Sequence, residues 1–339
     1  MLANVPRQRI PVDVLDAAHA RLQARAARDW AEADRLRQVI ESSGWRVIDR
    51  GIDFALEPAR PADFEEAGRV RYGSSDNVPS RLADPPQGYA TVVLSVDTAT
   101  VEPELDLARI AALERVLPAQ TSLVVVADGP SDEVDRALDG IDVGGARSES
   151  GLPLQVIQTS ARLGPAGAIN AGLRRATAPV VVVLDPIVEP TGDFVSPLVR
   201  ALDDTTVAIA GPWGLVTSDL RHFAPGDRGD VDAISGACQA FRRADYVARG
   251  PLDEKFRSTA YLDAWWSFVL RDEGAGRPPR RAVAIESLPL VRPASTTPEG
   301  NGAERGPTDR RDRSDRRDFY RYLDRFGRRF DLRNPPGAG

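Results

Sequence analysis

The chain has 339 residues, of which 42% are hydrophobic and 28% are charged, and its formal net charge at pH 7 is −6. This composition is typical of a soluble globular protein with one large domain and smaller additions, and the mild negative charge does not indicate a nucleic-acid binder. The single cysteine, Cys238, excludes an internal disulfide framework and a cysteine-rich zinc site.

The sequence shows neither a membrane span nor a secretion signal. No stretch reaches the roughly 18 apolar residues that a membrane-spanning helix needs. Residues 1–16 lack the apolar core of a signal peptide. We therefore expect a cytoplasmic protein and keep peripheral membrane association as an alternative.

Residues 1–57 are predicted to form a helical hairpin followed by short strands. Apolar residues recur at spacings of three and four between residues 12 and 43, which predicts two helices. Asp29 is placed to cap the second helix, and Gly44 is placed to end it. Residues 45–56 then favour two short strands.

Two polar stretches flank the central part of the chain. Residues 58–88 are rich in proline, glycine, serine and charged residues, so we predict a linker there. The C-terminal region, 294–339, begins with a polar stretch over 294–317 that predicts a mobile loop. An amphipathic helix is predicted over 319–330.

Residues 89–293 alternate short apolar runs with helical patterns. The predicted strands are 91–96, 122–128, 154–160 and 180–185, and the predicted helices are 105–117, 132–138 and 165–176. Strands and helices alternating at this spacing predict right-handed crossovers and a mainly parallel sheet buried on both faces, an α/β fold.

Ligands of such sheets bind beyond the carboxyl ends of the strands. The polar residues that follow the four predicted strands are Asp97, Asp128, Arg162 with Asn170, and Asp185. We take these residues as candidates for ligand binding. For each there is a structural alternative, because carboxylates at strand ends also cap helices and an Asp-Pro pair also closes a turn.

Four segments in chain order carry a family resemblance. They are VVLSVDTAT (92–100), VVVADGPSDE (124–133), residues 159–190 and residues 235–274. In this order they resemble the nucleotide-sugar-binding GT-A fold of inverting family-2 glycosyltransferases. The resemblance covers about residues 90–290 and is strongest to the rhamnosyltransferase-like branch.

The resemblance implies transfer of a sugar from a nucleotide-diphosphate donor to an acceptor hydroxyl. It implies that Asp97 and Asp128 line the nucleotide pocket and that Asp263 is the general base. Asn170 matches a family position, and Arg162 is an anion-binding candidate, so both are taken as donor-binding residues.

The metal motif departs from the family pattern. In relatives a Mg²⁺ or Mn²⁺ ion, held by the carboxylate of a DxD motif, neutralises the leaving diphosphate, and such hard cations take oxygen ligands. Here Ile187 stands where that carboxylate is expected. Asp185, two positions earlier, and Glu189, two positions later, could take its place only if the backbone bends differently, and Asp185 is the candidate for lining the site or binding a metal. Arg292, near the end of the resemblance, could neutralise a diphosphate without a metal.

Two classes of function follow. The first is an active glycosyltransferase, and the second is a catalytically degenerate relative that keeps the fold to bind a nucleotide sugar, a glycan or a protein. The substitution at Ile187 favours the second. The segment Leu262–Trp265 keeps one carboxylate, Asp263, where relatives have more, and it points the same way.

Residues 20–56 carry a second resemblance, to the small C-terminal region of cysteinyl-tRNA synthetases. The matching residues are Arg25, Asp29, Trp30, Ala33, Asp34, Arg37, Gly44 and Asp49. The catalytic signature of the synthetases is absent, so aminoacylation is excluded, and a role as an RNA-associated accessory protein is a third alternative. Arginines over 21–37 are balanced by acidic residues, which favours a solvated helix over an RNA surface.

Overall fold

The computed structural model describes residues 10–51, 53–59, 61–66, 68–99, 103–134, 153–226, 228–274, 276–292 and 310–334. The chain divides into two compact units, Met1–Asn77 and Val78–Gly339. In these described ranges, no helix is long and apolar enough to cross a membrane. The predicted mobile loop, up to residue 309, and the predicted helix beyond residue 134 lie outside them.

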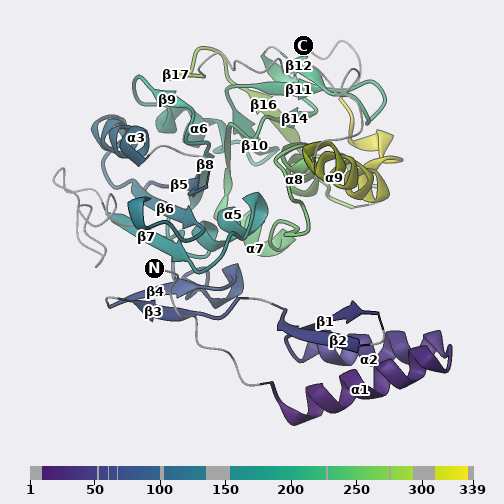
Figure 1. Ribbon diagram of the computed structural model, residues 1–339. Coiled ribbons are helices and arrows are strands. Elements are labelled where there is room, and N and C mark those ends of the chain that lie inside the picture. The colour runs from purple at the N-terminus through teal and green to yellow at the C-terminus, as the bar shows by residue number, and fades with distance from the viewer. Residues whose placement is uncertain are drawn as a thin grey trace. The chain divides into compact units, whose positions relative to one another are not determined.

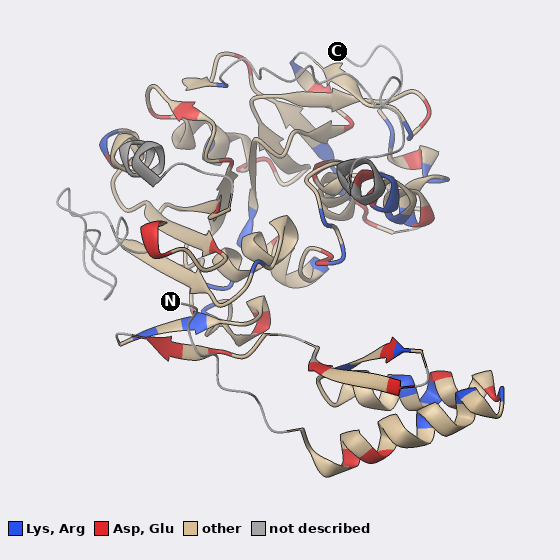
Figure 2. Ribbon diagram, viewed as in Figure 1, with Lys and Arg blue, Asp and Glu red and all other residues tan. Residues whose placement is uncertain are grey.

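The first unit begins with the predicted helical hairpin (Figure 1). Its elements are α1 (Val12–Ala26), α2 (Trp30–Ser42), β1 (Trp45–Arg50) and β2 (Asp53–Pro58). Strands β1 and β2 pair antiparallel, and Val14, Ile40 and Trp45 form part of the small core between helices and strands. In α1 the acidic residues lie in the first half and the arginines in the second, whereas in α2 acidic and basic residues are interleaved (Figure 2).

Residues of the synthetase-like pattern have structural roles in this unit. Asp29 caps α2 by accepting the Glu32 N–H at 3.1 Å, as predicted. Gly44 follows α2 at a positive φ of 79°, a conformation that glycine adopts without strain. Asp49 of β1 accepts two hydrogen bonds from Arg21 of α1, at 2.7 and 3.2 Å. The pattern thus accounts for the local fold.

The interval predicted as a linker is more structured than its composition indicated. It contains β3 (Phe64–Glu66), β4 (Arg69–Tyr72) and the short 3₁₀ helix η1 (Ser75–Asn77). β3 and β4 form an antiparallel hairpin. Asp63 accepts hydrogen bonds from the Gly73 N–H at 2.6 Å and from the Asn77 side chain at 2.8 Å.

The second unit is built on a large mixed sheet. Its strands are β5 (Ala90–Asp97), β6 (Ser122–Asp128), β7 (Leu154–Thr159), β8 (Val180–Leu184), β10 (Val207–Gly211), β13 (Gly229–Val231), β15 (Cys238–Arg242) and β16 (Arg281–Ala284), in the order β13-β16-β10-β15-β8-β5-β6-β7. Neighbours among β8, β5, β6 and β7 are parallel, and so are β10 and β16. β15 runs antiparallel between β8 and β10. The predicted α/β class with a mainly parallel sheet is confirmed, although the sequence revealed only the four parallel strands.

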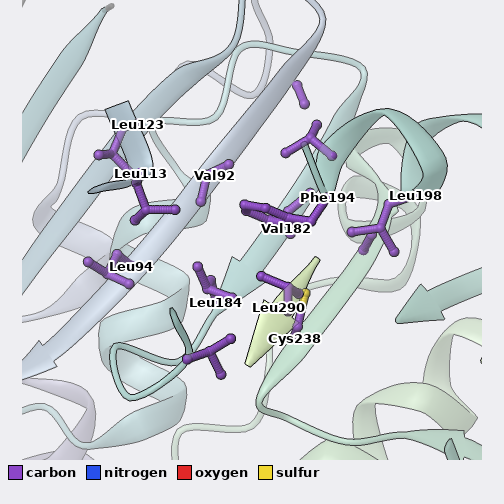
Figure 3. Packing of buried hydrophobic residues seen from close by; sticks show 14 of the residues in the cluster. Val92, Leu94, Leu113, Leu123, Val182, Leu184, Phe194, Leu198, Cys238 and Leu290 are labelled. Carbon is purple, nitrogen blue, oxygen red and sulfur yellow. The ribbon is translucent and has the colours of Figure 1, made fainter. Parts of the chain in front are cut away.

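Helices cover both faces of the parallel strands. They are α3 (Pro103–Val116), α5 (Pro165–Leu173) and α6 (Val195–Ala201). Leu113 of α3 and Leu198 of α6 belong to the same buried cluster as Leu94 and Val182 (Figure 3). On the other face, a Cβ added to Gly172 of α5 would lie 2.4 Å from the Val93 Cγ1, so α5 packs closely on β5. Burial on both faces explains why β5, β6 and β8 are largely apolar runs, whereas β7 also contains Gln155 and Gln158.

The remaining elements lie around this sheet. They are β9 (Glu189–Pro190), β11 (Gly214–Val216), β12 (Ala224–Gly226), β14 (Ala233–Ile234), β17 (Leu290–Val291), α7 (Arg243–Arg249), α8 (Leu262–Arg271), α9 (Arg310–Phe326) and η2 (Phe330–Leu332). The C-terminal helix α9 begins earlier than predicted and ends at Phe326. It packs on α8, with the rings of Phe268 and Phe326 5.5 Å apart (Figure 1).

Candidate functional site

The carboxyl ends of β5 and β6 bring two predicted residues together. Asp97 and Asp128 are direct partners in the parallel ladder. Arg162, just after β7, forms an ion pair with Asp97 through its Nη2 and the Oδ2 of the carboxylate. Its side chain is exposed, whereas Asp97 is half-buried. We call Asp97, Asp128 and residues 159–164 the nucleotide side.

Asp128 fixes the turn from β7 into α5. Its carboxylate is buried and accepts the Leu163 N–H at 2.6 Å, the Gly164 N–H at 2.9 Å and the Thr159 hydroxyl at 3.3 Å. Burial raises the pKa of Asp128, and the three hydrogen bonds act against that rise. Direct contact between Asp128 and a nucleotide stays a prediction.

Thr159 is a functional candidate that the sequence analysis missed. Its hydroxyl oxygen accepts the Gly129 N–H at 2.7 Å, and its hydroxyl lies 3.3 Å from the Asp128 Oδ1. It therefore joins the turn after β6 to the last residue of β7. The signal that could have revealed it is its position near the end of a predicted strand, since it ends β7 as Asp128 ends β6.

Asn170 is buried inside the second unit. Its side-chain oxygen accepts the Leu252 N–H at 3.0 Å and the Tyr246 hydroxyl at 3.2 Å. Its side-chain nitrogen donates to the Leu252 carbonyl at 2.9 Å and to Glu254 at 3.0 Å. These bonds tie α5 to the segment after α7, and the donor-binding role of Asn170 stays a prediction.

The segment 235–237 links Asp185 to Asp263. The Asp185 N–H donates to the Ala237 carbonyl at 2.9 Å, and the Gly236 N–H donates to the Asp263 Oδ2 at 3.1 Å. A Cβ added to Gly236 would lie 3.3 Å from the Asp263 Cβ, so a larger residue would crowd this contact. Two candidates that are far apart in sequence thus lie on either side of one short segment.

Asp263 lies in the first turn of α8 and is half-buried. Burial raises its pKa, while hydrogen bonds from the Gly236 and Ala264 N–H groups and the positive charge of Arg292 lower it. The preceding Tyr261 has a left-handed φ of 63°, which is uncommon for a bulky residue. Backbone strain of this kind is concentrated at functional sites.

Arg292 follows β17, the short strand that pairs with β9 just after the altered metal motif. β17 pairs antiparallel with β9, with Val291 opposite Glu189, so the next residue, Arg292, continues toward Val188 and Ile187. Its guanidinium lies over the Trp213 ring, 6.0 Å from the ring centre. We call Asp185, Ile187, Asp263 and Arg292 the transfer side.

The side chains at this motif do not fit a divalent cation. The Asp185 Oδ1 accepts the Ile187 N–H at 2.9 Å, and the Ile187 side chain, 41% exposed, has no atom that can bind a metal. In the part of the chain that the structure describes, no group of three or more His, Cys, Asp or Glu residues is placed to hold an ion. A hard cation needs several oxygen ligands, and this set supplies one carboxylate.

Asp128, residues 159–164 and the Asp185 turn fall within a segment that matches a family model. Residues 109–250 match the family model described as Glycosyl transferase family 2. This segment is similar to family 2 glycosyltransferases. The resemblance inferred from the sequence is confirmed. Asp97, Asp263 and Arg292 lie outside the matched residues.

Solved glycosyltransferases share similarity with the chain. A mannosyltransferase, PcManGT from Pyrobaculum calidifontis in complex with GDP-Man and Mn²⁺, is 19% identical, with a TM-score of 0.45, over 62% of this chain and 58% of that chain. GalNAc-T7 with UDP, GalNAc and Mn²⁺ is 13% identical, with a TM-score of 0.49, over 60% and 43%. S. aureus TarS 1-349 is 13% identical, with a TM-score of 0.43, over 59% and 58%. The chain thus spans less than two thirds of each.

A short stretch is similar to a tRNA synthetase. Over 57 residues the chain is 40% identical to the cysteine–tRNA ligase of Opitutus terrae (strain DSM 11246 / JCM 15787 / PB90-1). The match covers 17% of this chain and 12% of that protein. It bears out the second resemblance inferred from the sequence.

Proposed function

We propose that this protein transfers a sugar from a nucleotide-diphosphate donor to an acceptor hydroxyl, with inversion at the anomeric carbon. The family 2 domain supports the donor class. The observation that carries the proposal is the segment 235–237, which joins Asp185 at the end of β8 to Asp263 at the start of α8. The Asp185 turn and the candidate base Asp263 are thereby held together.

Each side of the site has a distinct role in this proposal. The nucleotide side holds the nucleotide of the donor. On the transfer side, Asp263 accepts the proton of the acceptor hydroxyl while the oxygen of that hydroxyl forms a bond to the anomeric carbon. The bond between that carbon and the diphosphate oxygen breaks, and the electron pair leaves with the nucleoside diphosphate. Asp263 must be ionised to act as this general base.

Release of nucleoside diphosphate from UDP-, GDP- and dTDP-sugars tests the proposal. We expect at least one donor to be turned over, and we expect Asp263→Asn to lower the rate by about a hundredfold or more, the range for loss of a general base. Asp204→Asn is the control, because Asp204 is exposed and precedes β10 at its amino end, at the opposite edge of the sheet. The configuration of the product, determined by NMR, tests inversion.

A second function is favoured by one observation. Ile187 replaces the expected carboxylate, which suits a protein that binds a nucleotide sugar or another partner without transferring the sugar. In that case donors would bind equally to the wild type and to Asp263→Asn, and neither protein would release nucleoside diphosphate.

A gel shift with tRNA at low salt, where phosphate binding is strongest, tests the RNA alternative for the first unit.

A further inference from the structure

Arg292 occupies a defined place on the transfer side. The pairing of β17 with β9 directs the chain at Arg292 toward Val188 and Ile187, the position from which relatives present a metal ligand. The Trp213 ring lies under the guanidinium and restricts its orientation. Its charge also acts on the candidate base, since it lowers the pKa of Asp263. One cation therefore acts on the candidate base from the end of a strand that pairs with the residues following the altered motif.

From this arrangement we infer that Arg292 binds the diphosphate of the donor and that donor binding needs no divalent cation. The inference rests on the proposed function, because it concerns the same site. It joins two features in one explanation: Ile187 replaces the metal carboxylate, and the pairing of β17 with β9 carries the chain at Arg292 toward residues 188 and 187.

The chemistry of the guanidinium suits this role. Arginine stays protonated at any physiological pH and presents paired N–H donors that match the oxygens of a phosphate. A carboxylate at residue 187 would form an ion pair with such a charge and compete with the diphosphate. The apolar Ile187 avoids that competition.

Calorimetric titration of the full chain with UDP, GDP and dTDP tests the inference. Each nucleotide is titrated in EDTA and again with Mn²⁺, for the wild type, Arg292→Gln and Arg292→Lys. The control is Arg200→Gln, because Arg200 is an exposed residue in the last turn of α6, before the amino end of β10. The thermal midpoint of each variant shows that it is folded.

We expect one of these nucleotides to bind wild type with the same Kd in EDTA and in Mn²⁺, within about twofold. Arg292→Gln should weaken that binding about tenfold or more, as for loss of one charge-assisted hydrogen bond, and Arg292→Lys should weaken it less. The corresponding nucleoside monophosphate should be affected less than the diphosphate by Arg292→Gln.

Three results would overturn the inference. Binding that requires Mn²⁺ would do so while supporting the proposed function, and so would metal-free binding that Arg292→Gln leaves unchanged. No binding of any nucleotide under either condition would overturn the proposed function together with the inference.

Discussion

The nucleotide side and the transfer side hold their carboxylates in different ways. The Asp128 carboxylate stabilises the turn between β7 and α5, because it accepts three hydrogen bonds from residues 159–164. Asp263 accepts two backbone N–H groups and also experiences the charge of Arg292. At one edge of the sheet, one carboxylate therefore shapes the backbone while the other lies within the influence of a charged side chain.

The pH dependence of transfer should distinguish the two sides most strongly. Asp263 must be ionised to act as a base, and burial raises its pKa above the ordinary value of 3.8. We expect kcat/KM to fall about tenfold per pH unit below this raised pKa. Because the charge of Arg292 lowers the same pKa, Arg292→Gln should move the acid limb to higher pH. A limb at the ordinary aspartate pKa would contradict this account.

Stability should follow the opposite trend with pH. A carboxyl whose pKa is raised by folding contributes stability that is complete below its unfolded pKa and is lost as the pH rises through its folded pKa. Asp128 and Asp263 both have raised pKa values, so they should lower the free energy of unfolding as they ionise. Denaturant midpoints measured between about pH 4 and pH 7 check the direction.

Asp128→Asn should damage the nucleotide side through its backbone. An asparagine presents an N–H₂ group where the carboxylate accepts the Leu163 or Gly164 N–H, so one buried donor loses its partner. We expect the free energy of unfolding to fall by about 1–3 kcal/mol and nucleotide affinity to fall with it. Chemical denaturation and calorimetry measure the two changes. Unchanged stability would show that the turn does not depend on this carboxylate.

A smaller effect is expected from the C-terminal helix. Asp318 of α9 is buried and accepts the Arg257 N–H at 3.1 Å, and it accepts both the N–H and the hydroxyl of Ser258 at 2.8 Å. These residues lead into Tyr261 and Asp263. Asp318→Asn should therefore lower kcat about two- to tenfold, as for loss of one hydrogen bond, and leave donor affinity unchanged. Steady-state kinetics with the donor varied separates the two parameters.

A second substitution at residue 318 tests whether the lost rate depends on the carboxylate. Asp318→Glu keeps the charge, so it should recover part of the lost rate. An equal loss of donor affinity in Asp318→Asn would mean that α9 supports the nucleotide side as well, and the division between the two sides would fail.

The sequence predicted the strands of the parallel part of the sheet. β5, β6 and β8 are mostly buried apolar runs, β7 places Val156 and Ile157 between two glutamines, and the parallel order follows from the helices between the strands. β15 was not predicted, and its Gln239 is a buried amide that donates to the Ile234 carbonyl at 2.7 Å. The β3–β4 hairpin escaped because its strands are very short.

The site was predictable where it depends on strand ends. Asp97 and Asp128 meet because parallel strands end at the same edge. The contact between Gly236 and Asp263 joins residues that are 27 positions apart, and no local pattern indicates it. The place of Arg292 depends on the pairing of two very short strands, β9 and β17, and needed the structure.

Hydrogen exchange with and without saturating nucleoside diphosphate tests the central claim most directly, because it reports on both sides at once. UDP, GDP and dTDP are added in turn to the full chain, and exchange of the Leu163, Gly164 and Gly236 amides is followed by mass spectrometry. If the two sides form one site, a nucleotide that binds should slow exchange in 162–164 and in 235–237 together. Slower exchange in only one of these segments, or in neither, would contradict the account.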